Sequence, residues 1–391
     1  MVRLANSLIR AARVEHPYLP LLLQACRDLS AARNELRQLR EYVAGQDRIA
    51  QEQIRRRRRR NQSKDQRKPR RRRLANRSSV KLPRLLELCR QRALGEPISY
   101  IRGSQPFGSL EILCERRVLI PRQTTANYTL RIAELLTRRL ADVKAQSPDN
   151  KIVFSILDLC TGSGCIPLLL HALLAPHFPH LRIIGTDLSE HALKLANKNL
   201  AWNMHAGNLG ARAANEVIFM KHNILEKLPA ELEEFDVVIS NPPYATPQEY
   251  RSSAISKSVR CYEPVEALVP DENLDPENVS GHTYFTAIDS VARSTRAKVV
   301  ICEMGLDEQF AHVCSELQAS PYWCKVEVWR DQVYSGLLGG EPQRERLILN
   351  DAHGLGVKTD ALGIGLYRVV VGIKEDWRWL NEQPCSIRGE E

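Results

Sequence analysis

Two features are missing from this sequence: a long apolar run and a cluster of metal-ligating residues. No stretch reaches the ~18 uncharged apolar residues of a membrane-spanning helix. The longest candidate, residues 152–174, is interrupted by Asp158, two glycines and Pro167. The 10 cysteines include no Cys-x-x-Cys pair, and no His-Glu-x-x-His is present, so the spacings that commonly hold zinc are absent. We therefore expect neither a membrane span nor a metal site.

Basic charge is also absent from most of the chain, although the formal net charge is +10. Between Arg55 and Arg73 lie 13 lysines and arginines and one acid, and the rest of the chain has 43 basic and 45 acidic residues. A nearly neutral body argues against a broad basic face that grips a duplex. The stretch from about 53 to 80 has few apolar residues and repels itself, so we predict a disordered insertion. It is either a solvated linker or a segment that contacts RNA or the ribosome through Arg55–Arg73.

The first 50 residues have the periodicity of amphipathic helices. The apolar positions that recur at helical spacing are Leu21, Leu22, Leu23, Leu29, Leu36, Leu39 and Val43. Arg3, Arg10 and Arg13 precede the first acid, Glu15, which is typical of an organellar presequence. The alternative is that these residues form the first helix of a domain.

Helical spacing returns near Leu85 and stops at Gly95-Glu96-Pro97, where glycine and proline end helices. Apolar and polar residues then alternate over 107–120, which predicts a β-hairpin with its turn at residues 115–117. We therefore predict a helical domain at 1–102 and a second domain at 103–391 that begins with this hairpin, and we expect a monomer.

From residue 151 onward, apolar runs with strand character alternate with helical stretches, which predicts an α/β domain with a mostly parallel sheet. The predicted strands are Ile152–Leu157, Arg182–Thr186, Glu216–Met220, Phe235–Ser240, Lys298–Cys302, Val326–Trp329 and Leu366–Val371. The glycine-rich stretch 335–365 is predicted to be a long loop.

A glycine-rich turn follows the first of these strands. Its sequence is Asp158-Leu159-Cys160-Thr161-Gly162-Ser163-Gly164-Cys165. Glycines let the backbone turn sharply and approach a ligand at a helix N-terminus. Asp187 ends the second strand, where a carboxylate can accept hydrogen bonds from ribose hydroxyls. This pair suits any adenosine-containing cofactor, so by itself it does not separate NAD from S-adenosylmethionine.

A second loop decides between those cofactors. The strand 235–240 leads directly into Asn241-Pro242-Pro243-Tyr244. The prolines stiffen the loop and remove backbone donors, so the carbonyl oxygens there and the Asn241 side chain form a site of acceptors, with Tyr244 as an aromatic wall. Such a site suits a planar NH₂ group. Accepting both hydrogens aligns the nitrogen and stabilises the positive charge that builds on it as it attacks an activated methyl group, such as that of S-adenosylmethionine.

These residues resemble the amino-methyltransferases of the seven-stranded S-adenosylmethionine class and, more narrowly, the HemK/PrmC-type release-factor glutamine methyltransferases. The narrow resemblance covers about residues 84–310. The segments that carry it, besides the two loops, are Gly95–Gly103 with Phe107-Gly108, Val118–Arg122, Asp187-Leu188-Ser189 with Ala192-Leu193, Val259-Arg260 with Tyr262-Glu263-Pro264 and Ala267-Leu268, and Glu303-Met304-Gly305.

The resemblance implies a seven-stranded Rossmann-like S-adenosylmethionine methyltransferase domain, preceded by a small helical domain and a β-hairpin. It implies that residues 160–164 cradle the methionine end of the cofactor, helped by Asp158 and Asn241, and that Asp187 holds the ribose. Asn223 and Ile224 would line the adenine. Asn241–Tyr244 would receive the glutamine of a Gly-Gly-Gln motif in a translation release factor, which the helical domain helps to recognise. The basic N-terminus suits the mitochondrial branch of the family, with a cytoplasmic location as the alternative.

The sequence departs from the family pattern in the segment before the catalytic domain and in the glycine loop. Residues 123–126 are Gln-Thr-Thr-Ala where the family has Pro-Glu-Thr-Glu, and Cys160 replaces a glycine, which is tolerated if its φ is negative. Two other functions stay open. One is methylation of the adenine amino group in RNA or DNA, which needs the same acceptor loop. The other is a catalytically weak, ribosome-associated binding protein.

Overall fold

A computed structural model describes residues 4–62, 85–146, 153–229, 232–270, 282–305, 307–333, 343–350, 356–375 and 377. The chain divides into two compact units. The first comprises residues 1–103 together with Lys257–Tyr262, and the second comprises Ser104–Ser256 and Glu263–Glu391. The short helix α11 (Lys257–Tyr262) therefore belongs to the helical unit, although the sequence predicted it in the second domain. The Ser258 hydroxyl of α11 donates to the carbonyl of Gly95, at 2.5 Å.

The first unit is a small bundle built from α1 (Asn6–Glu15), α2 (Leu19–Cys26), α3 (Leu29–Gln62), α4 (Leu85–Ala93) and α5 (Ile98–Arg102). Its core consists of leucines at helical spacing, including Leu22, Leu23, Leu39 and Leu88. Ala12 of α1 is fully buried in the same core. Helix α1 is therefore packed into this unit. This agrees with the prediction that the N-terminal residues form the first helix of a domain.

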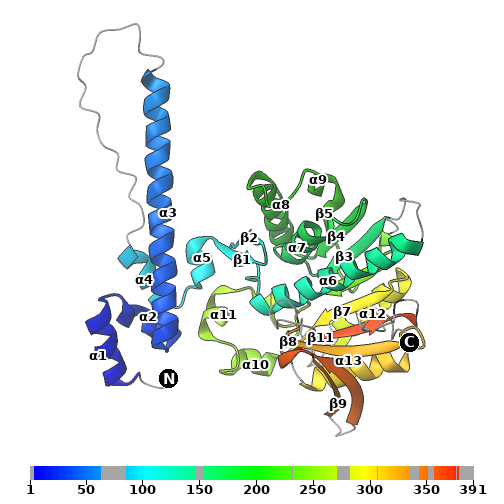
Figure 1. Ribbon diagram of the computed structural model, residues 1–391. Coiled ribbons are helices and arrows are strands. Elements are labelled where there is room, and N and C mark those ends of the chain that lie inside the picture. The colour runs from blue at the N-terminus through cyan, green and yellow to red at the C-terminus, as the bar shows by residue number, and fades with distance from the viewer. Residues whose placement is uncertain are drawn as a thin grey trace, which may run out of the picture. The chain divides into compact units, whose positions relative to one another are not determined.

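Helix α3 is longer than its packed part (Figure 1). Its residues in the hydrophobic core end at Val43, whereas the helix continues to Gln62. The prediction that disorder begins near residue 53 was therefore wrong for residues 53–62, because arginine and glutamine are good helix formers and extend a helix that is already nucleated. The remainder of that predicted insertion, from residue 63 to 80, lies outside the described residues.

The second unit begins with the predicted hairpin, but its turn is elsewhere. Strands β1 (Ser104–Phe107) and β2 (Leu110–Leu113) pair antiparallel, and Gly108 turns between them with φ +57°. A Cβ at Gly108 would lie 2.7 Å from Leu169, so only glycine allows the turn to pack there. A turn does lie at residues 115–118, where the amide of Val118 donates to the carbonyl of Glu115 at 3.3 Å and Arg117 has φ +74°, but it is not the turn of the hairpin. The predicted return strand at 118–120 is wrong, because the chain passes from β2 along the edge of the candidate site instead.

The main sheet contains all seven predicted strands. They are β3 (Phe154–Leu159), β4 (Leu181–Asp187), β5 (Val217–Lys221), β6 (Val237–Ser240), β7 (Val299–Glu303), β8 (Lys325–Gln332) and β11 (Ile364–Ile373). Two further strands, β9 (Arg344–Asn350) and β10 (Gly356–Leu362), extend it in the order β5-β4-β3-β6-β7-β11-β8-β10-β9. Because these two strands lie within 335–365, the predicted long loop there was wrong.

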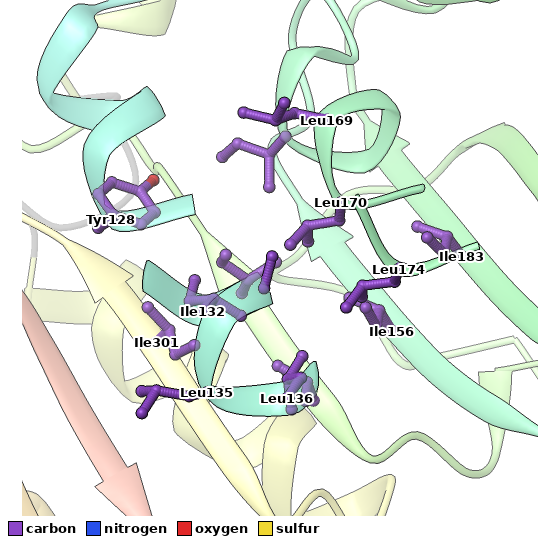
Figure 2. Packing of buried hydrophobic residues seen from close by; sticks show 14 of the residues in the cluster. Tyr128, Ile132, Leu135, Leu136, Ile156, Leu169, Leu170, Leu174, Ile183 and Ile301 are labelled. Carbon is purple, nitrogen blue, oxygen red and sulfur yellow. The ribbon is translucent and has the colours of Figure 1, made fainter. Parts of the chain in front are cut away.

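Helices cover both faces of this sheet (Figure 1). On one face α6 (Gln123–Gln146) and α7 (Cys165–Leu174) pack against Ile156, Ile183 and Ile301 of the strands (Figure 2). On the other face α12 (His282–Ser294) and α13 (Asp307–Ala319) pack against the side chains that alternate with these, such as Leu157 and Val300. Helices α8 (Glu190–His205), α9 (Ala213–Glu216) and α10 (Pro247–Arg251) complete the unit. The α/β class predicted from the sequence is confirmed.

Candidate active site

The ends of three neighbouring strands bring the two predicted loops together. Strand β3 pairs in parallel with β4 on one side and with β6 on the other. The carboxyl ends of parallel strands lie at one edge of a sheet, which is where open α/β sheets bind ligands. The glycine-rich turn follows β3, Asp187 ends β4, and Asn241 follows β6. Residues far apart in the sequence therefore meet at this edge.

The glycine-rich turn contains three residues with positive φ: Cys160 at 60°, Gly162 at 55° and Gly164 at 77°. It is held to β4 by the amide of Thr161, which donates to the carbonyl of Thr186 at 2.9 Å. The condition under which cysteine would replace glycine without strain, a negative φ at Cys160, is therefore not met. A non-glycine residue with φ in the left-handed region costs roughly 1–2 kcal/mol of backbone strain. Cys160 is in this region, so glycine would be unstrained at this position of the turn.

This strain can be measured by comparing two replacements of Cys160. Both Cys160→Gly and Cys160→Ala remove the thiol, but only glycine adopts φ +60° freely. We expect the glycine variant to be the more stable by about 1 kcal/mol in urea unfolding, the reverse of the usual order of these residues. An alanine variant of equal or greater stability would contradict the strain.

Asp187 is oriented by backbone donors rather than by a cation. One carboxylate oxygen accepts from the amide of Gly162 and the other from the amide of Ser189, each at 2.8 Å. Burial raises the pKa of Asp187, and these amides oppose the rise. The amide of His222, after β5, donates to the Asp187 carbonyl at 3.2 Å. The glycine turn and the ends of β4 and β5 are therefore fixed around one carboxylate.

A cavity of about 450 Å³ opens at this edge. Most predicted site residues line it, namely Cys160, Thr161, Gly162, Ser163, Asp187, Asn223, Ile224, Asn241 and Pro243. Gly164 lies beneath it at the start of α7, where a Cβ would come within 2.8 Å of Phe219. Pro242 and Tyr244 border the lining without belonging to it, and Asp158 lies in the interior of the sheet, fully buried.

The Asn241–Tyr244 loop presents acceptors that the rest of the described chain leaves unused. Neither the Asn241 side chain nor the Pro242 carbonyl has a hydrogen-bond partner among the described residues, and the Asn241 side chain is half-buried at the cavity wall. Tyr244 turns away from the cavity and its hydroxyl lies 3.4 Å from Glu303. The predicted aromatic wall is therefore packed against protein, whereas Asn241 lines the cavity and Pro242 borders it.

Four residues of the site were not identified from the sequence: Arg122, Thr125, Glu263 and Glu303. Glu263, buried, accepts from the amide of Ile120 at 3.0 Å and from the Arg122 guanidinium at 2.9 Å, and so fixes one wall of the cavity. Thr125 lines the cavity and donates to Glu303 at 2.7 Å. Arg122, Glu263 and Glu303 lie in family-like segments, which was the available signal, whereas Thr125 lies in the segment that departs from the family. The sequence does not show that Arg122 pairs with Glu263, 141 residues away, or that Thr125 pairs with Glu303, 178 residues away.

Comparison with known proteins shows sequence similarity to methyltransferases. Residues 137–268 match the family described as "Methyltransferase small domain". The chain is 36% identical over 190 residues to the "Probable MRF1 mitochondrial N(5)-glutamine methyltransferase mtq1" of Schizosaccharomyces pombe, covering 48% of this chain and 55% of that protein. It is 32% identical over 212 residues to the "Release factor glutamine methyltransferase" of Chlorobaculum tepidum, covering 54% and 62%.

The chain is thus similar in sequence to methyltransferases of the HemK/PrmC type. The "Mitochondrial MRF1 N(5)-glutamine methyltransferase MTQ1" of Saccharomyces cerevisiae is 29% identical over 271 residues, or 69% of this chain and 68% of that protein. The chain thus spans from about half to two thirds of the length of these HemK/PrmC-type relatives. A solved structure, "Crystal structure of hMettl16 catalytic domain in complex with MAT2A 3'UTR hairpin 1", covers 74% of this chain and 80% of its own at 15% identity, with a TM-score of 0.40.

The described residues of this chain give no sign of a metal site or a membrane helix. No three His, Cys, Asp or Glu side chains gather there as ligands. In the same part of the chain, no helix is both long and apolar enough to cross a bilayer.

Proposed function

We propose that this protein transfers a methyl group from S-adenosylmethionine to the side-chain amide nitrogen of the glutamine in a Gly-Gly-Gln motif of a translation release factor. One observation carries the proposal: the unused acceptors of Asn241 and Pro242 stand beside the cavity lined by the glycine turn and Asp187. The names of the relatives support the same substrate, since they act on glutamine and on release factors. Two of those names also support a mitochondrial location.

The residues that line the cavity fit S-adenosylmethionine. A Cβ at Gly162 would meet no atom within 4 Å, so this glycine leaves open space on the cavity side of the turn. The Asp187 carboxylate, pre-oriented by two amides, keeps lone pairs for ribose hydroxyls. Asn223 and Ile224 follow β5 and line the same cavity as Asp187, where they would line the adenine. When bound, the cofactor supplies an activated methyl group on a sulfonium.

The chain's own residues would then align the acceptor nitrogen. An amide NH₂ group is a poor nucleophile because its lone pair is delocalised. Accepting its two hydrogens at Asn241 and Pro242 orients the nitrogen and stabilises the positive charge that develops on it. Proline at 242 and 243 has no N–H, so no backbone donor of the loop competes with the substrate at these two positions. Burial raises the pKa of the Cys160 thiol, so the thiol stays neutral and does not act as a competing nucleophile.

The decisive assay measures transfer of a labelled methyl group to a mitochondrial release factor. We expect label on the wild-type factor and none when the glutamine of its Gly-Gly-Gln motif is replaced by alanine, since the only proposed acceptor is then gone. Peptide mass spectrometry locates the methyl group. Equal labelling of the alanine factor would overturn the proposed substrate.

Methylation of an adenine amino group in RNA remains the second candidate, because six consecutive arginines, 55–60, lie on the part of α3 beyond its packed core. Such a cluster can neutralise phosphates of RNA or of the ribosome. Replacing these arginines with glutamine keeps helix propensity and removes the charge. Loss of nucleic-acid methylation in that variant would favour the second function, whereas unchanged release-factor methylation favours the first.

A further inference from the structure

Tyr244 is held in place by the segment that follows β7, the parallel neighbour of β6. Its hydroxyl reaches Glu303, the last residue of β7. Its ring packs on Gly305, where a Cβ would come within 2.9 Å of the ring. Its carbonyl accepts a hydrogen bond of 2.7 Å from the side-chain amide of Gln309 in α13. The last residue of the acceptor loop is therefore fixed at its hydroxyl, its ring and its backbone.

Gln309 is the link between these two segments. Its side chain is fully buried. The amide nitrogen donates to Tyr244, and the amide oxygen accepts from the backbone N–H of Gly305 at 3.2 Å. A buried amide whose donor and acceptor ends are both used has one strongly preferred orientation, because losing either bond leaves a desolvated polar group unpaired. Gln309 thus joins the loop after β6 to the loop after β7.

The position of Tyr244 is transmitted to the acceptor atoms through a stiff connection. Only Pro242 and Pro243 separate Tyr244 from Asn241, and proline fixes φ near −65°. A shift of the Tyr244 backbone therefore moves the Pro242 carbonyl and the Asn241 side chain with it. On the far side, the amide of Ala245 donates to the carbonyl of Leu268 at 2.8 Å, so the loop is anchored just beyond Tyr244 as well.

We infer that Gln309 is a positioning residue for methyl transfer: through Tyr244 and Gly305 it holds the Asn241–Pro242 acceptors at the place where the substrate amide must bind. This inference rests on the proposed function. Gln309 does not line the cavity, so its loss should leave cofactor binding intact. Displacing reacting groups by about 1 Å can cost about 100-fold in rate, and we expect a fall in kcat of that order.

The test uses the full chain with three variants. Gln309→Leu removes both hydrogen bonds at similar volume. Gln309→Glu keeps an acceptor for Gly305 but donates to Tyr244 only when its carboxyl is protonated. Gln318→Leu is the matched control, because Gln318 lies on the same helix, is exposed, and donates to a backbone carbonyl, that of Lys358, at 2.9 Å. Each variant is assayed for kcat, for binding of S-adenosylhomocysteine by calorimetry and for hydrogen exchange of the peptide 241–250.

We expect Gln309→Leu to lose about 100-fold in kcat, to bind S-adenosylhomocysteine as the wild type does, and to exchange the Ala245 amide faster. Gln309→Glu should recover kcat relative to wild type as the pH is lowered, whereas Gln309→Leu should not. The charged groups near Tyr244, namely Glu303, Arg122 and Arg368, are the same in all variants, so the ratio to wild type isolates residue 309. Gln318→Leu should behave as wild type.

Three results would overturn the inference. These are an unchanged kcat in Gln309→Leu, unchanged exchange at Ala245, or, if the leucine variant folds poorly, a Gln309→Glu rate that follows the wild-type pH profile. A wild-type protein that labels no release factor would instead refute the proposed function. The exchange measurement then still decides whether Gln309 holds the loop.

Discussion

Replacing Asn241 with alanine is expected to lower kcat for release-factor methylation by about 10²–10³-fold. The Asn241 side chain meets no partner among the described residues and lines the cavity, so its removal unpairs nothing within the described part of the protein. What is lost is one of two acceptors for the substrate NH₂ group, and with it stabilisation of the charge that forms on nitrogen. Asn241→Asp keeps acceptor oxygens and should retain more activity than the alanine variant.

The measurement is single-turnover methyl transfer at saturating cofactor, with binding of S-adenosylhomocysteine measured separately. Asn197→Ala is a suitable control, since Asn197 is exposed on α8 and, among the described residues, its side chain bonds only to the carbonyl of Leu193, at 2.9 Å. A similar loss in the control, or a loss in Asn241→Ala that follows weaker cofactor binding, would mean that Asn241 does not act on the substrate amide.

The central strands were predictable because each is buried on both faces. Strands β3, β6 and β7 are almost uninterrupted apolar segments, and parallel strands covered by helices have this composition. The edge strand β9 and its neighbour β10 gave no such signal. β9 begins Arg344-Glu345-Arg346, and those side chains are exposed or pair with acids such as Asp360. An edge strand tolerates charge and nearby glycine, so its composition is that of a loop.

The turn of the hairpin was missed for a related reason. Alternation over 107–120 is a property of the residues, whereas the turn is set by which glycine can approach α7. Gly108 packs closely against Leu169 of α7. The segment 118–120 has strand-like residues, but Glu263 binds the amide of Ile120, so that this backbone donor is satisfied by a side chain from a distant part of the chain rather than by a neighbouring strand.

The candidate site shows the same division between local and distant information. Consecutive residues such as the glycine turn and Asn241–Tyr244 have recognisable chemistry, and the structure brings them to one cavity. The φ of Cys160 depends on how the turn closes against β4, which composition does not record. The network that joins Thr125, Tyr244 and Glu303 depends on the pairing of β6 with β7 and the approach of α6. Such contacts follow from topology, not from spacing along the chain.

Replacing Asp158 with asparagine is expected to stabilise the second unit above neutral pH, and the gain should grow as the pH rises from about 4 to about 8. Asp158 is fully buried in β3, and neither carboxyl oxygen has a hydrogen-bond partner among the described residues. Desolvation raises its pKa to about 8 from 3.8, the Thr161 hydroxyl opposes the rise, and Asp187 adds to it. An Asp158 carboxyl that keeps its proton at neutral pH is a structural residue of the sheet rather than an ionised ligand.

Proton binding by Asp158 determines how the free energy of unfolding changes with pH. Between about pH 4 and 8 the folded state holds this proton and the unfolded chain does not, so unfolding releases a proton. The carboxyl's favourable contribution is complete below pH 3.8 and is lost as the pH rises through about 8. Asparagine has a similar shape and no charge to lose, so its advantage over aspartate should increase by at most about 1.4 kcal/mol per pH unit in this range and then level off.

Urea unfolding followed by tryptophan fluorescence is the measurement for Asp158→Asn, because all 5 tryptophans of the sequence lie in the second unit. The other acids are present in both proteins, so the difference between the two unfolding free energies reports on Asp158 and on its interaction with Asp187. A difference that stays constant from pH 5 to pH 9 would show that Asp158 is ionised in the folded protein. The Asp158 carboxylate would then need a cationic partner. Contact with the cofactor, as the family resemblance implied, would then explain why Asp158 lies next to the glycine turn.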